Sequence, residues 1–288
     1  MVVSHHIQVF SVIKNNRKYD YLLCIDSDGT VMDTMTIKHL NCFGPCFIEV
    51  FGITEHTKDI LDHWNHTNLY SMDRGINRFQ GLKEILEYVD LKYGYKFDGV
   101  SVFYNWVINT KAFSVDLLKE ESNKYPNNDV LKKAISWSNL VNERIRLLPP
   151  SLTFENTKEA LEVYSNCVDL LGVSSANLDA VLEEWNRLDV SKYFMDILCQ
   201  DSGSKESIIR EALTLGYEKD HVIMLGDAIG DLKAAKKNGV LFFPIIPSKE
   251  KECWQELIDI KDSILLNKYK DLEDHYINKF EKFLKGDN

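Results

Sequence analysis

The sequence is poor in positive charge and contains no long apolar run. Among its 288 residues, lysine and arginine number 34 and aspartate and glutamate number 44, so the formal net charge is −10. This balance does not suit general binding to nucleic acid or to an anionic membrane surface. No run approaches the roughly 18 apolar residues of a membrane span, and the first residues lack the pattern of a signal peptide. We therefore predict a cytoplasmic protein with no nucleic-acid or membrane partner.

The cysteines also lack the spacing of a zinc site or a disulfide framework. All six are scattered along the chain, and three lie in apolar runs that are typical of buried strands: Cys24, Cys167 and Cys199. Free cysteine packs as a small apolar side chain, so we predict reduced thiols in the protein core. Apolar residues make up 44% of the sequence, which is enough to build one large domain or two ordinary ones.

What the sequence does contain is a pair of carboxylates directly after an apolar run. Residues 21–34 read YLLCIDSDGTVMDT, where Asp26 and Asp28 precede Gly29 and Thr30. A short apolar run without alternation is typical of a strand buried on both faces of a parallel sheet. Ligands bind at the carboxyl ends of such strands, where two like charges repel unless a cation or a proton separates them. The stretch therefore predicts a metal site.

The rest of the chain divides into a helical stretch and a stretch of alternating elements. Up to about residue 147, apolar residues recur at helical spacing with no strand pattern between them. After Pro149 and Pro150, strand-like and helix-like segments alternate, which predicts a parallel sheet with helices on both faces. We predict a doubly wound, Rossmann-like α/β core of residues 1–34 and 148–288, with residues 35–147 inserted as a helical cap domain. The strands predicted after the insert are 167–174, 193–200, 221–227 and 240–246.

Three of these strand ends carry polar side chains; the first two are weak signals when taken alone, and the third is the strongest. Ser174 in SSAN has the position of a helix N-cap, and Lys205 in GSKES has that of a surface lysine. Asp227 and Asp231 in GDAIGD can serve as turn and cap residues. The set is stronger than its members, because four successive strand ends carry carboxylates, a hydroxyl, a lysine and carboxylates in that order. We therefore predict that they form one site.

The motifs DSDGT, SSAN, GSKES and GDAIGD resemble the four signature motifs of the haloacid dehalogenase superfamily, in the same order. The resemblance covers about residues 15–34 and 148–247, and the insert resembles the cap of phosphoglycolate phosphatases and β-phosphoglucomutases. Two positions depart from the family pattern: Ser27 stands where an apolar residue is frequent, and no proline follows Lys205. The resemblance implies a magnesium-dependent phosphatase that hydrolyses a small phosphorylated metabolite through an aspartyl phosphate.

The resemblance also implies a role for each motif residue. Phosphate monoesters are anions that resist hydrolysis, so a catalyst has to neutralise charge and align the attack. Asp26 would be the nucleophile and Asp28 the general acid and base. Mg²⁺ prefers oxygen ligands and keeps several waters. The implied catalytic residues are Asp26, Asp28, Ser174 and Lys205; the implied phosphate-binding residues are Ser174, Ser175, Asn177 and Lys205; the implied metal ligands are Asp26, Asp28 through its backbone carbonyl, Asp227 and Asp231.

The insert contains one stretch that suits an anionic substrate. In SMDRGINRFQGL, residues 71–82, Arg74 and Arg78 flank Gly75 close to a predicted helix start. Arginine side chains match carboxylate or phosphate oxygens two at a time. We predict Arg74 and Arg78 as substrate-binding residues, and the alternative is an exposed pair of surface arginines.

Two other functions stay open at the level of sequence. A phosphomutase on the same scaffold would return the phosphoryl group to a bound sugar phosphate. A phosphate-sensing binding module would form an aspartyl phosphate without turnover. Asp28 as a second acid and the large insert favour an enzyme over the binding module. The sequence predicts neither the identity of the substrate nor an oligomeric state.

Overall fold

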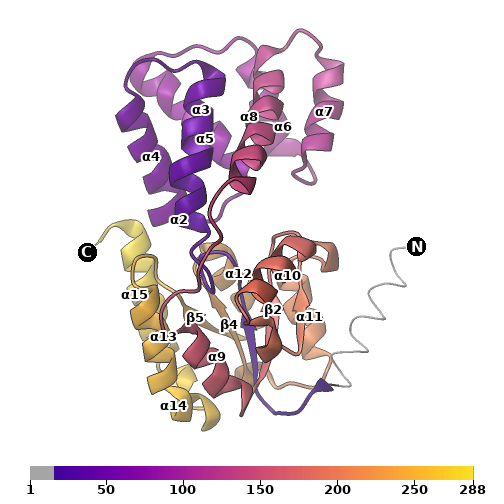
Figure 1. Ribbon diagram of the computed structural model, residues 1–288, viewed down its shortest axis with the longest axis vertical. Helices are drawn as coiled ribbons and strands as arrows, with labels where there is room; N and C mark the ends of the chain where they lie inside the picture. The colour runs from indigo at the N-terminus through magenta and orange to yellow at the C-terminus, as the bar shows by residue number, and fades with distance from the viewer. Residues whose placement is uncertain (1–15, 288) are drawn as a thin grey trace. The chain divides into compact units, whose positions relative to one another are not determined.

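The computed structural model describes residues 16–287, which form two compact units. The core unit contains the described residues up to Met35 and those from Pro150 onward, and the helical unit is Thr36–Pro149. Figure 1 shows the elements of each unit. The predicted core domain begins at residue 1, and its first fifteen residues, on which the signal-peptide argument depends, lie outside the described residues.

The core unit is built on a five-stranded parallel sheet with the strand order β3-β2-β1-β4-β5. Ile25 in β1 lies opposite Gly172 in β2 and Leu225 in β4. All five strands fall within segments that the sequence predicts as strands, and helices cover the sheet on both faces (Figure 1). The predicted doubly wound α/β fold is therefore confirmed. The strands are β1 (Leu22–Ile25), β2 (Asp169–Val173), β3 (Asp196–Leu198), β4 (Val222–Gly226) and β5 (Leu241–Pro244).

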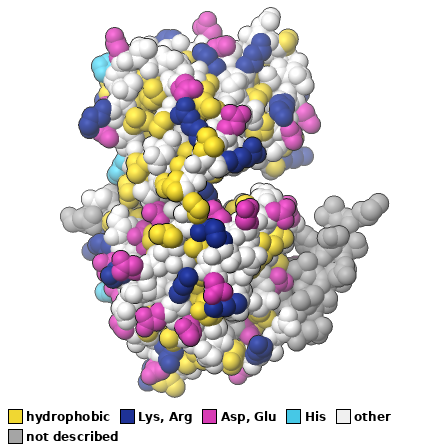
Figure 2. Space-filling view, in the orientation of Figure 1, with side chains coloured by type: hydrophobic (Ala, Val, Ile, Leu, Met, Phe, Trp, Pro, Cys, Tyr) yellow, Lys and Arg dark blue, Asp and Glu magenta, His cyan; other side chains and the backbone are white. Residues whose placement is uncertain are grey.

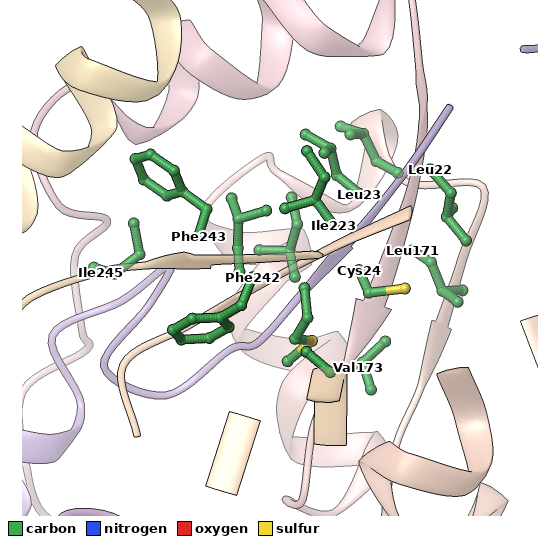
Figure 3. Close-up of a cluster of buried hydrophobic side chains, with 14 of the residues drawn as sticks. Leu22, Leu23, Cys24, Leu171, Val173, Ile223, Phe242, Phe243 and Ile245 are labelled. Atoms are coloured by element: carbon green, nitrogen blue, oxygen red, sulfur yellow. The ribbon is translucent and has the colours of Figure 1, made fainter. Parts of the chain in front are cut away.

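Apolar side chains from the strands fill the core of this unit. Figure 3 shows Leu23 and Cys24 of β1 near Leu171 of β2 and Ile223 of β4, with Phe242 of β5 beyond them. Each fully buried side chain of this size contributes roughly 1.5–3 kcal/mol to folding. All six cysteines are free thiols, and all but the half-buried Cys167 are buried, which confirms the predicted packing role.

Helices connect the strands, and the chain after β5 covers the open edge of the sheet. Glu273 accepts a hydrogen bond from the backbone amide of Phe242 at 2.8 Å, and the Tyr269 hydroxyl donates to the Phe242 carbonyl at 2.7 Å. These contacts satisfy edge groups that otherwise invite pairing with another chain. The elements are α9 (Thr157–Ser165), α10 (Leu178–Arg187), η2 (Ser191–Tyr193), η3 (Gln200–Ser202), α11 (Lys205–Leu213), η4 (Lys219–His221), α12 (Ile229–Asn238), α13 (Glu250–Asp259), α14 (Lys261–Leu265), η5 (Tyr269–Asp271) and α15 (Glu273–Lys285).

The helical unit packs around its own aromatic core, in which Trp64 and Trp137 are both fully buried. Local signals set the helix ends: Asn77 and Gln80 form a capping box at the start of α5, and Asn128 caps α8. The elements are α2 (Met35–Lys38), η1 (His39–Phe43), α3 (Gly44–Phe51), α4 (Thr57–Tyr70), α5 (Arg78–Tyr93), α6 (Val100–Asn109), α7 (Val115–Lys124) and α8 (Asp129–Arg146).

Charged side chains of both signs are interspersed over the surface that Figure 2 shows. Some form pairs one helical turn apart, such as Lys58 with Asp62 and Lys83 with Glu87, each at 2.6 Å. Exposed pairs of this kind contribute only about 0–1 kcal/mol each, so they add little to the stability of the fold. Along residues 16–287, no helix combines the length and the apolar character that crossing a membrane requires.

Candidate active site

The carboxyl ends of β1 and β4 lie side by side in the middle of the sheet. Strands β2 and β3 follow on one side of this pair and β5 on the other, so the strand order reverses between β1 and β4. In open α/β sheets, ligands bind at such a reversal point. Asp26 follows β1 directly, Asp227 follows β4 directly, and the Asp26 amide donates to the Leu225 carbonyl at 3.0 Å. The sheet topology thus brings the first and the last motif together.

The chain turns sharply after Asp26. The carbonyl of Ser27 accepts a hydrogen bond from the Val31 amide at 2.9 Å, which closes the turn. Gly29 has a φ of 80°, a conformation that glycine adopts without steric cost. The turn leaves Ser27 fully buried and Asp28 half-buried beside it. The two aspartates of the first motif therefore have different environments.

Lys205 joins two of the carboxylates. It is the first residue of α11, where the Ser204 hydroxyl caps the helix by accepting from the Ser207 amide at 3.2 Å. The Lys205 ammonium lies 2.8 Å from Oδ1 of Asp26 and 2.6 Å from Oδ1 of Asp231. The helix dipole disfavours a cation at this end of a helix. The two ion pairs offset this effect and explain why a lysine is present here.

Carboxylate oxygens of Asp26, Asp227 and Asp231 all lie within 4.8 Å of one another. A Cβ atom on Gly226 would lie 2.3 Å from Cγ of Asp231, so the close approach of Asp231 to the end of β4 requires glycine at this position. The other carboxylate oxygen of Asp231 accepts from the Ala228 amide at 3.1 Å. Within residues 16–287, these three buried aspartates are the acidic side chains that lie close enough together to hold a metal ion.

The charges in this group shift the pKa values of its members. Burial raises the pKa of Asp26 well above its ordinary value; the Lys205 ammonium opposes this rise, and the charges of Asp231 and Asp227 add to it. Burial also raises the pKa of Asp231, again against the effect of Lys205. Burial lowers the pKa of Lys205, but the carboxylates of Asp231 and Asp26 outweigh it, so the net shift is upward. Three carboxylates this close together repel one another when ionised, so a cation bound among them would be favoured.

Two threonines that the sequence analysis did not assign to the site orient its carboxylates. The Thr34 hydroxyl donates to Oδ1 of Asp28 at 2.6 Å, and the Thr30 hydroxyl donates to Oδ1 of Asp227 at 3.1 Å. Both threonines belong to the stretch that begins with Asp26. Their position within a few residues of Asp28 is the feature of the sequence from which both threonines could have been predicted.

The SSAN segment follows β2 at the same sheet edge. Ser174 is 3% exposed, and its hydroxyl oxygen accepts a hydrogen bond from the Ala176 amide at 3.1 Å. The N-cap of α10 is Asn177, whose side chain accepts from the Ala180 amide at 3.3 Å. The alternative interpretation of Ser174 as the helix cap is therefore wrong, because the N-cap lies three residues later, at Asn177. Ser175 and Asn177 are exposed.

The two predicted substrate-binding arginines are held within the helical unit. Arg74 is only 3% exposed and donates to the Leu69 carbonyl at 2.7 Å, so the alternative of an exposed pair is wrong for Arg74. Arg78 is half-buried and donates from Nη1 to the Ser138 hydroxyl at 3.1 Å and to the Asn142 side chain at 2.7 Å. Their role in substrate binding stays a prediction.

Similar solved structures include three bacterial proteins. A haloacid dehalogenase-like family hydrolase from Streptococcus pneumoniae is 16% identical, with a TM-score of 0.45 over 82% of this chain and 90% of that chain. A HAD-superfamily hydrolase of subfamily IA, variant 1, from Geobacter sulfurreducens is 14% identical, with a TM-score of 0.47 over 85% and 98%. A HAD family hydrolase from Deinococcus radiodurans, with bound phosphate and sodium, is 11% identical, with a TM-score of 0.44 over 80% and 81%. No curated protein matches the chain.

A family model adds a direct match to the sequence. The model of the haloacid dehalogenase-like hydrolases matches residues 116–245, a segment that contains SSAN, Lys205 and GDAIGD. Asp26 and Asp28 precede the matched segment, and the parallel sheet brings Asp26 to the same edge as the matched motifs. The match confirms the resemblance predicted from the motifs: over residues 116–245 the chain is similar to haloacid dehalogenase-like hydrolases, which supports an enzyme of this type.

Proposed function

We propose that this enzyme is a magnesium-dependent phosphatase that hydrolyses a small phosphorylated metabolite through an aspartyl phosphate formed on Asp26. The observation that carries the proposal is the buried group of Asp26, Asp227 and Asp231 next to the Lys205 ammonium. Phosphoryl transfer requires little covalent chemistry from a protein and depends on positioning and on cations that neutralise the phosphoryl oxygens. A nucleophilic carboxylate beside an ammonium and a cation site meets that requirement.

The donor set of the site fits Mg²⁺. It consists of carboxylate oxygens within 4.8 Å of one another, and Mg²⁺ prefers oxygen ligands supplied by a few carboxylates, waters and a substrate phosphate. In this proposal Asp26, Asp227 and the backbone carbonyl of Asp28 would hold the ion directly, and Asp231 would bind it through water. The bound ion would neutralise charge on the phosphate and orient it.

Asp26 and Asp28 would share the bond-making steps. A carboxylate oxygen of Asp26 attacks phosphorus while the ester P–O bond breaks, and Asp28 gives a proton to the departing alkoxide. Asp28 then takes a proton from a water molecule that attacks the aspartyl phosphate, which releases inorganic phosphate and restores the Asp26 carboxylate. The Thr34 hydroxyl, 2.6 Å from Oδ1 of Asp28, would hold this side chain in one orientation.

Ser174 and Lys205 would bind the phosphate oxygens. The Ser174 oxygen already accepts a hydrogen bond from the Ala176 amide, so its own proton is available to donate to an anion. Ser175 and Asn177 lie at the start of α10, where backbone amides and the helix dipole favour an anion. Lys205 would exchange part of its contact with Asp26 for a phosphate oxygen.

The helical unit would serve as the cap domain that selects the substrate, with Arg74 and Arg78 as binding residues. Among residues 16–287, every hydrogen bond that the Arg78 guanidinium makes comes from Nη1, and its partners are neutral. Its Nε and Nη2 edge is therefore available for a carboxylate or phosphate, which arginine binds with two parallel hydrogen bonds. This supports Arg78 more directly than Arg74, which is buried.

The test is the release of inorganic phosphate from a panel of sugar phosphates, nucleotides and phosphoglycolate, at substoichiometric enzyme with Mg²⁺ or with excess EDTA. The proposal expects many turnovers with Mg²⁺ and none in EDTA. Mostly isomerised product would indicate the phosphomutase, and at most one phosphate per chain would indicate the binding module. Turnover that persists in EDTA would contradict the metal requirement.

A further inference from the structure

Ser27 is a polar residue in a fully buried position between Asp26 and Asp28. Its hydroxyl oxygen accepts a hydrogen bond from Nε1 of Trp185 at 3.0 Å, and both side chains are 0% exposed. Burying a hydroxyl or an indole N–H costs free energy unless the group has a hydrogen-bond partner. Here the serine hydroxyl and the indole N–H are partners of each other. The contact therefore depends on both side chains.

The indole of Trp185 is held against the sheet. A Cβ atom on Gly172 in β2 would lie 3.0 Å from Cζ3 and 3.1 Å from Cη2 of the ring, so the indole occupies space that a side chain at this position would restrict. Phe194 packs on the indole at a ring-centroid distance of 4.5 Å. In a closely packed interior a ring confined in this way has one orientation, so the direction of its N–H is fixed.

Trp185 belongs to α10, the helix that begins after SSAN. Its hydrogen bond thus connects two parts of the site: the turn that carries Asp26 and Asp28, and the helix whose start follows Ser174. The two partners are 158 residues apart in the sequence. A shift of α10 along the sheet would break or lengthen this bond, so the bond sets the position of the turn relative to the helix.

A second tryptophan contacts the same turn in a different way. Nε1 of the buried Trp254 donates to the backbone carbonyl of Thr30 at 3.0 Å. Any residue at position 30 offers that carbonyl. The contact of Trp185 instead requires a side-chain acceptor at position 27, which serine supplies. The residue between the two aspartates is therefore matched to Trp185 specifically.

We propose that Trp185 and Ser27 form a positioning pair that holds Asp26 and Asp28 in register with the start of α10. The kinetic part of this inference rests on the proposed phosphatase function. In-line attack tolerates errors of only about 0.5 Å in the placement of reacting groups, so a loosened turn lowers the rate of the chemical step more than it lowers substrate binding.

The test compares Ser27→Ala, Trp185→Phe and the double variant, with p-nitrophenyl phosphate as substrate. We expect each single variant to lower kcat at least about tenfold with KM changed less than about threefold. The double variant should be no more than about twofold slower than the slower single variant, because all three lack the same bond. Losses that multiply in the double variant, or single variants with kcat within twofold of wild type, would overturn the pair.

Tyr164→Phe is the matched control. The buried Tyr164 hydroxyl donates to the Leu257 carbonyl at 2.6 Å, so this variant also loses one buried hydrogen bond in the core unit, outside the motifs. We expect it to keep kcat within about twofold of wild type at a temperature where all variants are folded. A tenfold loss in this control as well would show that the effect on the rate is general destabilisation.

Hydrogen exchange gives a readout that does not depend on turnover. The Val31 and Met32 amides bond to the Ser27 carbonyl, and we expect their exchange to accelerate at least about tenfold in both single variants but not in Tyr164→Phe. If exchange is faster in the two variants but the wild-type protein hydrolyses no phosphate ester, the positioning pair is supported and the phosphatase function is rejected. If the wild-type protein hydrolyses phosphate esters but exchange and kcat are unchanged in the variants, the phosphatase function is supported and the positioning pair is rejected.

Discussion

Nζ of Lys205 lies 2.8 Å from Oδ1 of Asp26, with the two side chains 14% and 8% exposed. The same ammonium lies 2.6 Å from Asp231, so one positive charge is shared between two carboxylates, with Asp227 close to both. The arrangement places three carboxylates and one ammonium close together in a largely buried region. Its stability and its chemistry should therefore both respond to the removal of a charge and to the addition of a cation.

Lys205→Met should destabilise the core unit by about 3–5 kcal/mol in EDTA, because removing one partner of a buried ion pair leaves the other charge uncompensated. Saturating Mg²⁺ should recover part of this loss. Thermal unfolding in EDTA and in Mg²⁺ measures both effects. Lys279→Met is the control, since Lys279 pairs with Glu256 at 2.7 Å at a partly exposed position and should cost only about 0–1 kcal/mol. Equal losses in the two variants would contradict the special role of Lys205.

Asp26→Asn should reduce phosphate release to background, below about 1% of wild type, which corresponds to more than roughly 3 kcal/mol of lost transition-state stabilisation. The amide keeps the shape of the side chain but removes the attacking charge. Asp33→Asn is the control, because Asp33 is exposed and lies in the same segment of the chain. Activity above the 1% level in Asp26→Asn would rule out Asp26 as the nucleophile.

The parts of the fold and site that follow from the sequence are those with local signals. The strand at Leu22–Ile25 is buried on both faces, so its apolar run is continuous, and the next residue is the polar Asp26. The carboxyl ends of parallel strands meet at one edge of the sheet, so Asp26, Asp227 and Lys205 could be predicted to lie at that edge.

The parts that the sequence does not predict depend on packing between distant elements. The hydrogen bond from Trp185 to Ser27 exists because α10 lies against β2 at Gly172, which no local pattern encodes. The burial of Arg74 has the same origin, since it depends on how the loop before α5 folds onto Leu69 at the end of α4. Propensity and periodicity describe single elements, so contacts that arise from their packing stay outside their reach.

Asp28→Asn should lower kcat by about 10²–10⁴-fold, the usual contribution of a general acid and base, while Mg²⁺ affinity changes less than about threefold. The side chain of Asp28 is bonded to Thr34 and is not part of the triad of carboxylates within 4.8 Å, so its loss should spare the metal site. Isothermal titration with Mg²⁺ and measurement of phosphate release separate the two effects. A collapse of Mg²⁺ affinity together with activity would assign Asp28 to the metal instead.

His39 in the helical unit should make stability depend on pH. Nδ1 of His39 accepts a hydrogen bond from Nε1 of the buried Trp64 at 3.1 Å, which requires the neutral ring. Burial, and then the charges of Arg74, Lys38 and Arg78, lower the pKa of His39 to about 3. Between pH 6.5 and that value the unfolded chain binds a proton that the folded chain does not, so the free energy of unfolding falls as pH falls, by roughly 1.4 kcal/mol per unit.

His39→Asn keeps an acceptor for Trp64 without a titrating ring. In urea unfolding followed by tryptophan fluorescence, the decrease in stability between pH 7 and pH 5 should be about 2 kcal/mol smaller in this variant than in the wild type. An identical pH dependence in the two proteins would show that His39 binds its proton equally well in both states.

Arg78 is the residue of the helical unit whose substitution should distinguish a large substrate from a small one. Its guanidinium lies 5.2 Å from the centre of the Phe43 ring and bonds to α8 through Nη1, so its position is fixed while its other edge can meet an anion. Arg78→Gln should lower kcat/KM for the best metabolite substrate at least about tenfold, or 1.4 kcal/mol, and change p-nitrophenyl phosphate hydrolysis less than about twofold. Arg146→Gln, at an exposed position of α8, should change neither. Equal losses on both substrates would assign Arg78 to the stability of the helical unit, and no loss on either would reject it as a substrate-binding residue.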